Sequence, residues 1–444
     1  MKKTLLILLG FFLLIQTGYS QQQNGPWTLE QCIDYALQNN IRVKRSQLDF
    51  EQSRADLLQS RAAMIPTLNA SGTHRYAFGR TIDPVENRFV EQTIQSNDFG
   101  LNSDVLIFGG LQTQNTIKQN KAISESNIAA MEQAKNDVSI NVASSFLTVL
   151  LNQELLENAI FQFNTSTEQV GRTQRLMEAG SVPRANLLEI KATNATDELA
   201  VVNAENQLAL SKLQLMQFLQ LPYNPEFEVA DPQIDIDENV GLIQSVGEIY
   251  DAALITQPIM RSMNLRLKSA HLSETIARGG NSPSLVAFGN VNTYYTNRLA
   301  NQFSFGQQLD NHLGQNLGFR INIPIFNNYR VKNDIQRSRI FIKNAEINSL
   351  ETQNNLRQEV EQAYLDARTA SKRYNSVQKQ VEALREAFRV TEQRFNLGAA
   401  NAVDYNVSKN NLNQAESDMI RAKFDYIFRM KVLDFYQGKA LSLD

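Results

Sequence analysis

Apolar and small side chains recur at three- and four-residue steps along most of the chain, and this spacing predicts long helices. Two such rows are Ala415, Met419, Ala422, Tyr426, Met430 and Leu433, and Leu188, Ala192, Ala195, Leu199 and Val202. The remaining positions are rich in Gln, Asn, Lys and Glu, as on the outside of a coiled coil. From Gln112 to Glu178 the chain has no proline and a single glycine, Gly171. At 1.5 Å per residue, one helix over this stretch would be about 100 Å long.

Polar and apolar residues alternate at period two in four shorter stretches, 67–78, 99–108, 285–295 and 313–324. The alternation predicts four β-strands, each with one polar and one apolar face. The polar face is predicted to include Asn69, Ser71, Thr73, Arg75, Arg320 and Asn322. The alternation alone fits a soluble β-sandwich and a membrane β-barrel equally well. A sandwich needs more than four strands, however, and a barrel would place these six side chains in its aqueous lumen.

The chain repeats itself at an offset of 217 to 218 residues. Ala36 matches Ala253, Pro66 matches Pro283, and Phe108 matches Phe326. Farther along, Gly180 matches Gly398 and Asn186 matches Asp404. Each match is weak alone, but their constant offset indicates a two-fold internal repeat.

Both repeats are expected to follow one order: helix, strand pair, very long helix, tip, helix. The first repeat, 21–220, has its strand pair at about 67–108, its long helix at 110–179 and its last helix at 183–220. The second, 246–437, has its strand pair at about 285–325, its long helix at 329–397 and its last helix at 401–437. A proline- and acid-rich linker, 221–245, joins the repeats, and a tail, 438–444, follows them.

The first residues, 1–20, have the pattern of a secretory signal peptide. Lys2 and Lys3 precede the apolar run 4–15, and small residues before Gln21 suit a cleavage site. The run is short for a membrane span, and no cysteine follows the cleavage site to carry a lipid anchor. Cys32, the one cysteine, cannot form an internal disulfide. Removing the two signal lysines makes the net charge more negative than −3, which argues against a nucleic-acid partner.

No enzyme motif stands out. The three histidines, His74, His271 and His312, are scattered without a metal-binding spacing, and no phosphate loop or nucleophile elbow is present. The carboxylates are spread along helices, where they indicate solvated faces. We therefore expect neither catalysis nor a cofactor nor a bound metal.

Four strands cannot close a barrel, and open sheet edges are not tolerated in lipid. The chain should therefore assemble with copies of itself. Two copies would give eight strands, and three would give twelve, enough for an aqueous lumen. The polar face of the predicted strands favours three copies, because it suits an aqueous lumen.

The signal peptide, the repeated strand pairs opened by "PTL" and "PSL", the "FGG" step into a long helix, and the "GAANAVD" break make the chain resemble the TolC-type outer membrane efflux proteins. The resemblance implies a mixed α/β membrane protein. In it, three chains form a twelve-stranded barrel in the outer membrane lipid, and long antiparallel helices form a coiled-coil tunnel in the periplasm. It also implies a passive exit duct for a tripartite efflux or type I secretion system, joined by a periplasmic adaptor to an inner-membrane pump or exporter.

The main alternative is a periplasmic coiled-coil structural or adaptor protein without a barrel. The full-length repeat and the two strand pairs favour the duct. Drug, metal and protein export remain open as substrates. The loops 79–97 and 296–311 would face outward.

The glycine breaks acquire roles from the same resemblance. It implies that they are hairpin tips that dock the adaptor, through Gly180, Ser181, Val182, Gly398, Ala399 and Ala400. It also implies that Asp404 constricts the tunnel mouth, with Asn186 as its neutral equivalent in the first repeat. Where some members carry an arginine and a second aspartate, this chain has Ala400 and Val407, so that the charged latch is largely missing. From the residues alone, the breaks are plain helix turns and Asp404 is a charge at a helix N-terminus.

Overall fold

The computed structural model describes residues 25–83, 85, 87–91, 93–232, 245–439 and 441. The expected signal peptide, about half of the expected linker (233–244) and four residues of the expected tail (440 and 442–444) lie outside the described residues.

The element order repeats, as the sequence offset predicts. The first repeat contains α2 (Leu29–Asn39), α3 (Ile41–Ala62), β1 (Asn69–Ala77), β4 (Ile94–Gly109), α4 (Gln112–Glu178) and α5 (Arg184–Leu219). The second contains α6 (Val246–Thr256), α7 (Pro258–Gly279), β5 (Ser284–Thr296), β6 (Gly314–Asn322), α9 (Arg330–Asn396) and α10 (Ala402–Tyr436). Both long helices, α4 and α9, have 67 residues. The mixed α/β class with four main strands and a two-fold repeat is therefore confirmed.

The first helix shows how local sequence sets an element boundary. Thr28 caps α2, and its side chain accepts a hydrogen bond from the backbone N–H of Gln31. The Gln31 side chain in turn accepts from the backbone N–H of Thr28, which completes a capping box. Gln31 closes the box because it occupies the third helical position, from which a side chain reaches back to the cap.

The chain forms two compact units, and each repeat contributes to both. The hairpin unit contains the described residues up to Val43, those of 135–252 and those from Val360 onward. The sheet unit contains Lys44–Ala134 and Ala253–Glu359. The sequence repeats are therefore not the spatial units, because each repeat runs from the hairpin unit through the sheet unit and back.

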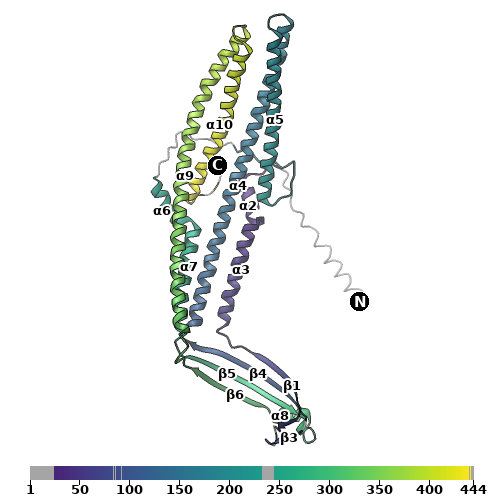
Figure 1. The fold of residues 1–444 in the computed structure, drawn as a ribbon, viewed down its shortest axis with the longest axis vertical. Helices are drawn as coiled ribbons and strands as arrows, with labels where there is room; N and C mark the ends of the chain where they lie inside the picture. The colour runs from purple at the N-terminus through teal and green to yellow at the C-terminus, as the bar shows by residue number, and fades with distance from the viewer. Residues whose placement is uncertain are drawn as a thin grey trace, which may run out of the picture. The chain divides into compact units, whose positions relative to one another are not determined.

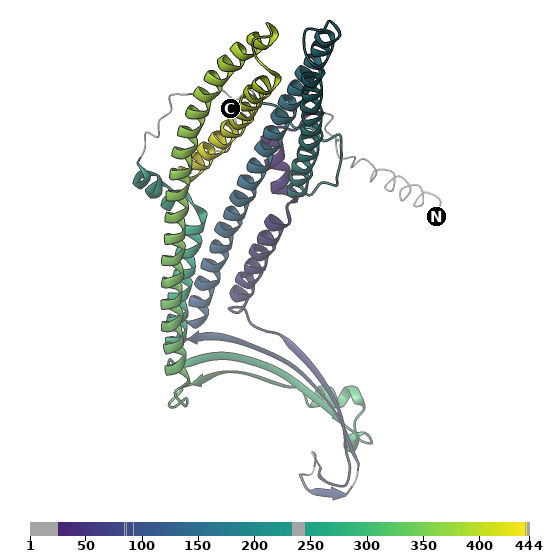
Figure 2. The ribbon, with the colours of Figure 1, turned by 45° about the horizontal axis from the view of Figure 1, so that its top comes forward.

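The sheet unit is built on one antiparallel sheet with the order β1-β4-β5-β6 (Figure 2). Asn69 lies opposite Asn102 in the first strand pair. In the second, Val286 lies opposite Arg320. These two pairs correspond under the sequence offset, so the two strand pairs have the same register. β4 joins β5 with Asn102 opposite Asn290, which leaves β1 and β6 at the two edges of this sheet.

Four helices of the sheet unit lie side by side in the order α3, α4, α7, α9, which matches the strand order (Figure 1). The Asn120 side chain on α4 donates to the Asp56 carbonyl on α3. The Ser338 hydroxyl on α9 donates to the Ser273 carbonyl on α7. The central pair, α4 and α7, is linked by the Gln119 side chain, which donates to the Ser273 hydroxyl over 2.6 Å.

The turn from β4 into α4 packs closely against the end of α7. A Cβ atom added at Gly110 would lie 2.3 Å from the carbonyl oxygen of Gly279. One added at Gly279 would lie 2.5 Å from the carbonyl oxygen of Gly110. This approach fixes the strand pair of the first repeat to the helix of the second. Gly110 and Leu111, just before α4, both have positive φ. In the second repeat, Asn328 and Tyr329 adopt the same left-handed conformation just before α9.

The loops 79–97 and 296–311 contain structure that the sequence analysis did not predict. The first holds the hairpin β2 (Arg80–Ile82) with β3 (Phe89–Glu91), and the second holds a 3-10 turn (Asn297–Leu299) and α8 (Phe305–Asn311). Arg298 and the buried Asp83 form an ion pair at 2.7 Å, which ties the two loops together.

The core of the hairpin unit lies where α2, α4, α5 and α10 meet. It includes the fully buried Cys32, Phe146, Leu215 and Met216 and, from the second repeat, Phe424. None of the helices in the described part of the chain is long and apolar enough to cross a bilayer.

Candidate functional site

Each helical hairpin of the hairpin unit turns at a glycine with φ of +72°. At the first tip, the Ser181 N–H donates to the Leu176 carbonyl over 2.8 Å, and the Gly180 N–H donates to the Met177 carbonyl over 2.9 Å. This pair of bonds is the Schellman motif, whose left-handed position suits glycine. Pro183 then precedes α5, where its missing N–H costs nothing.

The second tip repeats this geometry. The Ala399 N–H donates to the Arg394 carbonyl over 2.8 Å, and the Gly398 N–H donates to the Phe395 carbonyl over 3.0 Å. Asn401 caps α10 in place of proline, and its side chain accepts from the Asp404 N–H over 2.8 Å. The two breaks are thus equivalent tight turns. Four of the six expected docking residues are exposed, and Val182 and Ala400 are half-buried.

Asp404 and Asn186 occupy the same place, the third residue of the helix that follows each tip. Asp404 is exposed and Asn186 is half-buried. A carboxylate in the first turn of a helix interacts favourably with the helix dipole. The structure therefore places the Asp404 carboxylate at the surface, in the first turn of α10.

An apolar cluster behind the tips joins the two hairpins. Ile190 of α5 packs with Phe395, Ala402 and Tyr405 of the second hairpin, all of them buried. The Phe395 and Tyr405 rings lie 4.9 Å apart. Burial, followed by the charge of Glu392, raises the pKa of the Tyr405 hydroxyl above its usual range, so this group stays neutral. Next to the tips, the two hairpins are therefore held together by buried apolar contacts.

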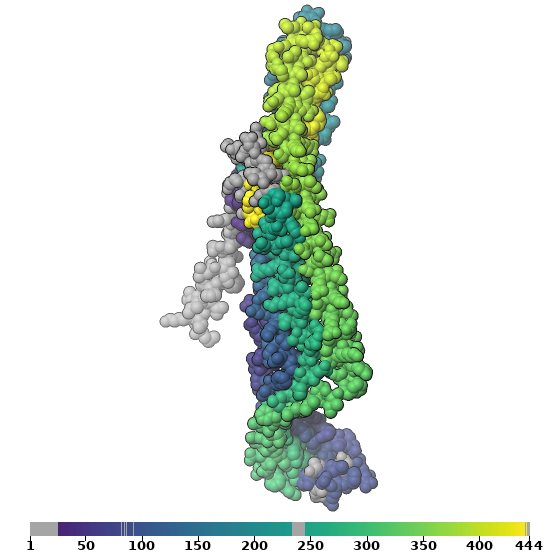
Figure 3. Space-filling model, turned by 90° about the vertical axis from the view of Figure 1, so that its left-hand side faces the viewer, coloured from purple at the N-terminus to yellow at the C-terminus, as the bar shows by residue number. Residues whose placement is uncertain are grey.

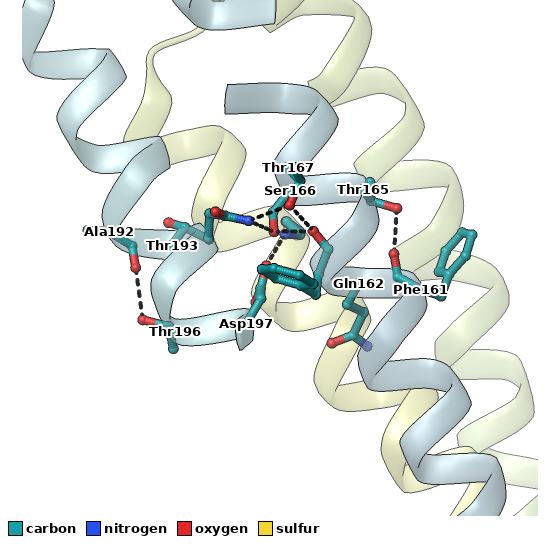
Figure 4. Close-up of polar contacts among 12 residues, drawn as sticks. Phe161, Gln162, Thr165, Ser166, Thr167, Ala192, Thr193, Thr196 and Asp197 are labelled. Atoms are coloured by element: carbon teal, nitrogen blue, oxygen red, sulfur yellow. Dashed lines mark hydrogen bonds and ion pairs between the residues drawn. The ribbon is translucent and has the colours of Figure 1, made fainter. Parts of the chain in front are cut away.

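A buried ion pair also connects the hairpins. The Lys409 ammonium of α10 lies 2.7 Å from the Asp197 carboxylate of α5, and both side chains are at most 10% exposed. The first hairpin is held by Asn194, whose amide donates to the Ser166 and Thr167 hydroxyls. Figure 4 shows Ser166 and Thr167 on one helix facing the helix that carries Thr193 and Asp197.

Sequence reasoning assigned no contact to Lys409. It missed the pair with Asp197, because the repeat places Ala415 at the position equivalent to Asp197. No sequence periodicity could have linked two residues 212 positions apart.

The sheet separates the polar from the apolar positions. Strand pairing places Asn69, Ser71, Thr73 and Arg75 on one face together with Asn102 and Asn290. Arg320 and Asn322 share that face, because they lie opposite Val286 and Ser284. The structure therefore brings the six expected lumen residues onto a single face. The other face of β6 presents Leu317, Phe319 and Ile321, which are 66% to 87% exposed.

The sequence matches the family described as "Outer membrane efflux protein" over residues 32–219 and 249–430. It is 21% identical to "Outer membrane protein TolC" of Escherichia coli (strain K12), over 96% of this chain and 84% of that protein. It is 24% identical to "Probable outer membrane lipoprotein SilC" of Salmonella typhimurium, over 85% of this chain and 77% of that protein.

Solved structures share the fold. CusC, described as undergoing folding and transmembrane channel formation, superposes with a TM-score of 0.80 at 16% identity, over 95% of this chain and 96% of that chain. The open state of the Neisseria gonorrhoeae MtrE outer membrane channel superposes with a TM-score of 0.73 at 18% identity, over 92% of this chain and 88% of that chain.

Proposed function

The chain belongs to the outer membrane efflux protein family, and on this premise we propose that it works as a homotrimeric, passive exit duct. It is an outer membrane channel protein of an efflux system, with its helical part in the periplasm. The proposal adds the number of copies, the partners and the roles of individual residues. A periplasmic adaptor without a membrane channel is not favoured.

The sheet carries the proposal. It has one polar face, one apolar face and two edges whose backbone groups pair with no other strand of the described chain. Unpaired edges are costly in lipid, where no water can bond the free N–H and C=O groups. Three copies would give twelve strands and a lumen lined by the polar face, including Arg75 and Arg320.

The tips are proposed to dock a periplasmic adaptor, which connects the duct to an inner-membrane pump or exporter. Their Schellman turns expose Gly180, Ser181, Gly398 and Ala399, and Leu397 beside them is 84% exposed. Small residues in a rigid turn allow a partner helix to approach closely, at little cost in conformational entropy.

Asp404 is proposed to narrow the tunnel mouth. Three copies would bring three exposed carboxylates around one axis, and this ring of negative charge would attract cations to the mouth. Asn186 adds no charge at the equivalent place. The ring of Asp404 carboxylates would then constrict the mouth in place of the charged latch, which is largely missing from this chain.

Membrane fractionation and conductance test the duct. The protein should fractionate with the outer membrane, and its purified oligomer should conduct ions across planar lipid bilayers. Recovery as a soluble periplasmic protein, or an oligomer that gives no current, would contradict the proposal.

Three variants test the constriction. Asp404→Ala should raise the single-channel conductance and reduce the preference for cations, because it removes the charge ring. Asn186→Asp should increase that preference, because it adds a second ring. Glu226→Gln, in the loop after α5, serves as a control that removes one exposed carboxylate far along the chain from either tip. If Asp404→Ala and Glu226→Gln give the same current as the parent, Asp404 does not constrict the mouth.

A further inference from the structure

The loop between β5 and β6, residues 297–313, is fixed to the sheet at the point where it begins. The backbone N–H of Gln95 in β4 donates to the Asn297 side chain over 3.0 Å. The Asn297 amide in turn donates to the Thr93 carbonyl over 3.3 Å. Together with the ion pair to the other loop, these bonds determine the direction in which the chain leaves the sheet.

The helix of this loop, α8, packs on β5. Gln308 is fully buried, and its side chain accepts from the backbone N–H of Thr296 over 3.0 Å and donates to the Phe303 carbonyl over 3.2 Å. The Thr293 hydroxyl donates to the Leu309 carbonyl over 2.6 Å. A helix of seven residues is too short to be stable alone, so these contacts with the strand hold it in place.

Ring contacts show on which face of the sheet α8 lies. The Phe305 ring of α8 lies 5.1 Å from the Tyr295 ring of β5 and 6.4 Å from the Phe99 ring of β4. Side chains alternate between the two faces along a strand, so Tyr295 shares a face with Val291, and Phe99 shares one with Leu101. Val291 and Leu101 lie opposite each other on the apolar face. The helix α8 therefore covers part of the apolar face, and the polar face proposed to line the lumen is the opposite one.

The axis of α8 follows β5. Phe305, near the start of the helix, contacts Tyr295, and Leu309, near its end, contacts Thr293. Four residues of helix rise about 6 Å, and two residues of strand span nearly the same distance. Figure 1 shows α8 at the end of the sheet that lies away from α3 and α7. Figure 3 shows the surface at this end of the sheet, with the second repeat in green and the first in blue.

The position of α8 determines what it can contact. The strands below it, β4 and β5, are the two central strands of the sheet, so the helix lies away from the edges at which another copy could pair. The protein is an outer membrane channel protein with its helical part in the periplasm, so the far end of the sheet points outward. Lipid is the neighbour of an apolar barrel face, and its outer leaflet lies at this end.

The side chains at α8 suit the boundary between acyl chains and headgroups. Phe303, Phe305 and Leu313 are 39%, 48% and 49% exposed. Gln307 and Asp310, on the same helix as Phe305, are exposed polar residues. Aromatic and polar side chains at one level are typical of a membrane interface, where each kind meets its preferred surroundings.

We propose that α8 is an interfacial helix that rests in the outer leaflet of the outer membrane. Its Phe305 side chain and the preceding Phe303 lie among the acyl chains, and Gln307 and Asp310 lie at the headgroups. The loop then stabilises the barrel wall from the lipid side and does not cover the exit. The inference rests on the proposed duct for the orientation of the sheet, and it adds the lipid contact of one loop.

Quenching of tryptophan fluorescence by brominated acyl chains tests this position. Trp27 is the one tryptophan of the chain, so Trp27→Phe gives a background without tryptophan. Phe305→Trp is the test variant. Leu317→Trp is the control deep in the bilayer, because Leu317 is 87% exposed on the apolar face, about 20 Å along the sheet from α8. Thr73→Trp, on the polar face, is the control in water.

The full-length proteins are compared in phosphatidylcholine vesicles brominated near the glycerol or near the chain end. Shallow bromine should quench Phe305→Trp most and deep bromine Leu317→Trp most, because an interfacial helix lies only about 5–10 Å into the boundary. Thr73→Trp should be quenched by neither. If only Leu317→Trp is quenched, the position of α8 is wrong and the duct stands. If Leu317→Trp is not quenched either, the sheet does not face lipid, and the proposed duct fails as well.

Labelling of intact cells with a membrane-impermeant maleimide tests the two sides of α8 independently. Gln307→Cys and Phe305→Cys are a matched pair, two residues apart on the same helix. Gln307→Cys should react at least about tenfold faster, because the reactive thiolate forms in water and is suppressed among acyl chains. The protein with Cys32 alone gives the background. Equal or faster labelling of Phe305→Cys would place its side chain in water and overturn the interfacial helix.

Discussion

At the residue scale, the tips depend on two glycines whose conformation other residues adopt at a cost. Nothing lies within 4 Å of a Cβ atom added at Gly180 or Gly398, so alanine there meets no clash. The left-handed backbone alone should destabilise the turn by about 1–2 kcal/mol. Hydrogen exchange at Ala399 should accelerate about tenfold in Gly398→Ala, because a tenfold change in an opening equilibrium corresponds to about 1.4 kcal/mol.

Gly171 provides the matched control for this prediction. It lies inside α4 with equally open space around it, so Gly171→Ala should stabilise the helix by about 0.5–1 kcal/mol. If both substitutions change hydrogen exchange in the same direction, the tip does not depend on its left-handed turn.

Cys32 should be chemically silent in the folded protein. Burial, with a smaller contribution from the charge of Glu30, raises the pKa of its thiol from 9.0 to about 12. The thiol therefore stays protonated near pH 8.5 and should react with a maleimide only after unfolding. The stability that this shift contributes is complete below pH 9 and is lost as the pH rises toward 12, because the unfolded thiol ionises first. Rapid labelling of the folded protein would contradict this environment.

Some residue roles could be predicted from the sequence and some could not. The glycine breaks were predictable because glycine followed by proline or by small residues marks a helix end. The Thr28 cap was also predictable, because threonine is a preferred residue at helix N-caps. The Lys409–Asp197 pair was not, because it depends on how two hairpins from different repeats pack.

At the element scale, that ion pair should hold α10 against α5. Lys409→Met leaves the Asp197 carboxylate buried without its partner, which should cost about 3–5 kcal/mol. Asp197→Leu combined with Lys409→Met replaces the pair by apolar side chains and should be close to neutral. Thermal unfolding of the three proteins checks both expectations. Equal losses in the single and double variants would show that the charge pair is not the linking contact.

The long elements were predictable because they are long. The long helix expected at 110–179 is α4, Gln112–Glu178, since no proline interrupts it and a leucine with positive φ precedes it. The short elements β2, β3 and α8 were missed, because three to seven residues carry too little periodicity. One signal was available for α8, the capping box formed by Ser304 and Gln307.

At the scale of the whole molecule, the sequence repeat explains both the fold and the expected assembly. Four strands with two free edges leave the sheet incomplete in a single chain. The polar face and the apolar face were predictable from alternation. The strand order was not predictable, because periodicity does not say whether β4 pairs with β5 of the same chain or with a strand of another copy.

Native mass spectrometry of the protein extracted from outer membranes tests the central claim most directly. The account predicts one species with the mass of three mature chains, which gives the twelve strands that a lumen requires. A species of one chain, or of two chains with eight strands and a filled interior, would contradict it.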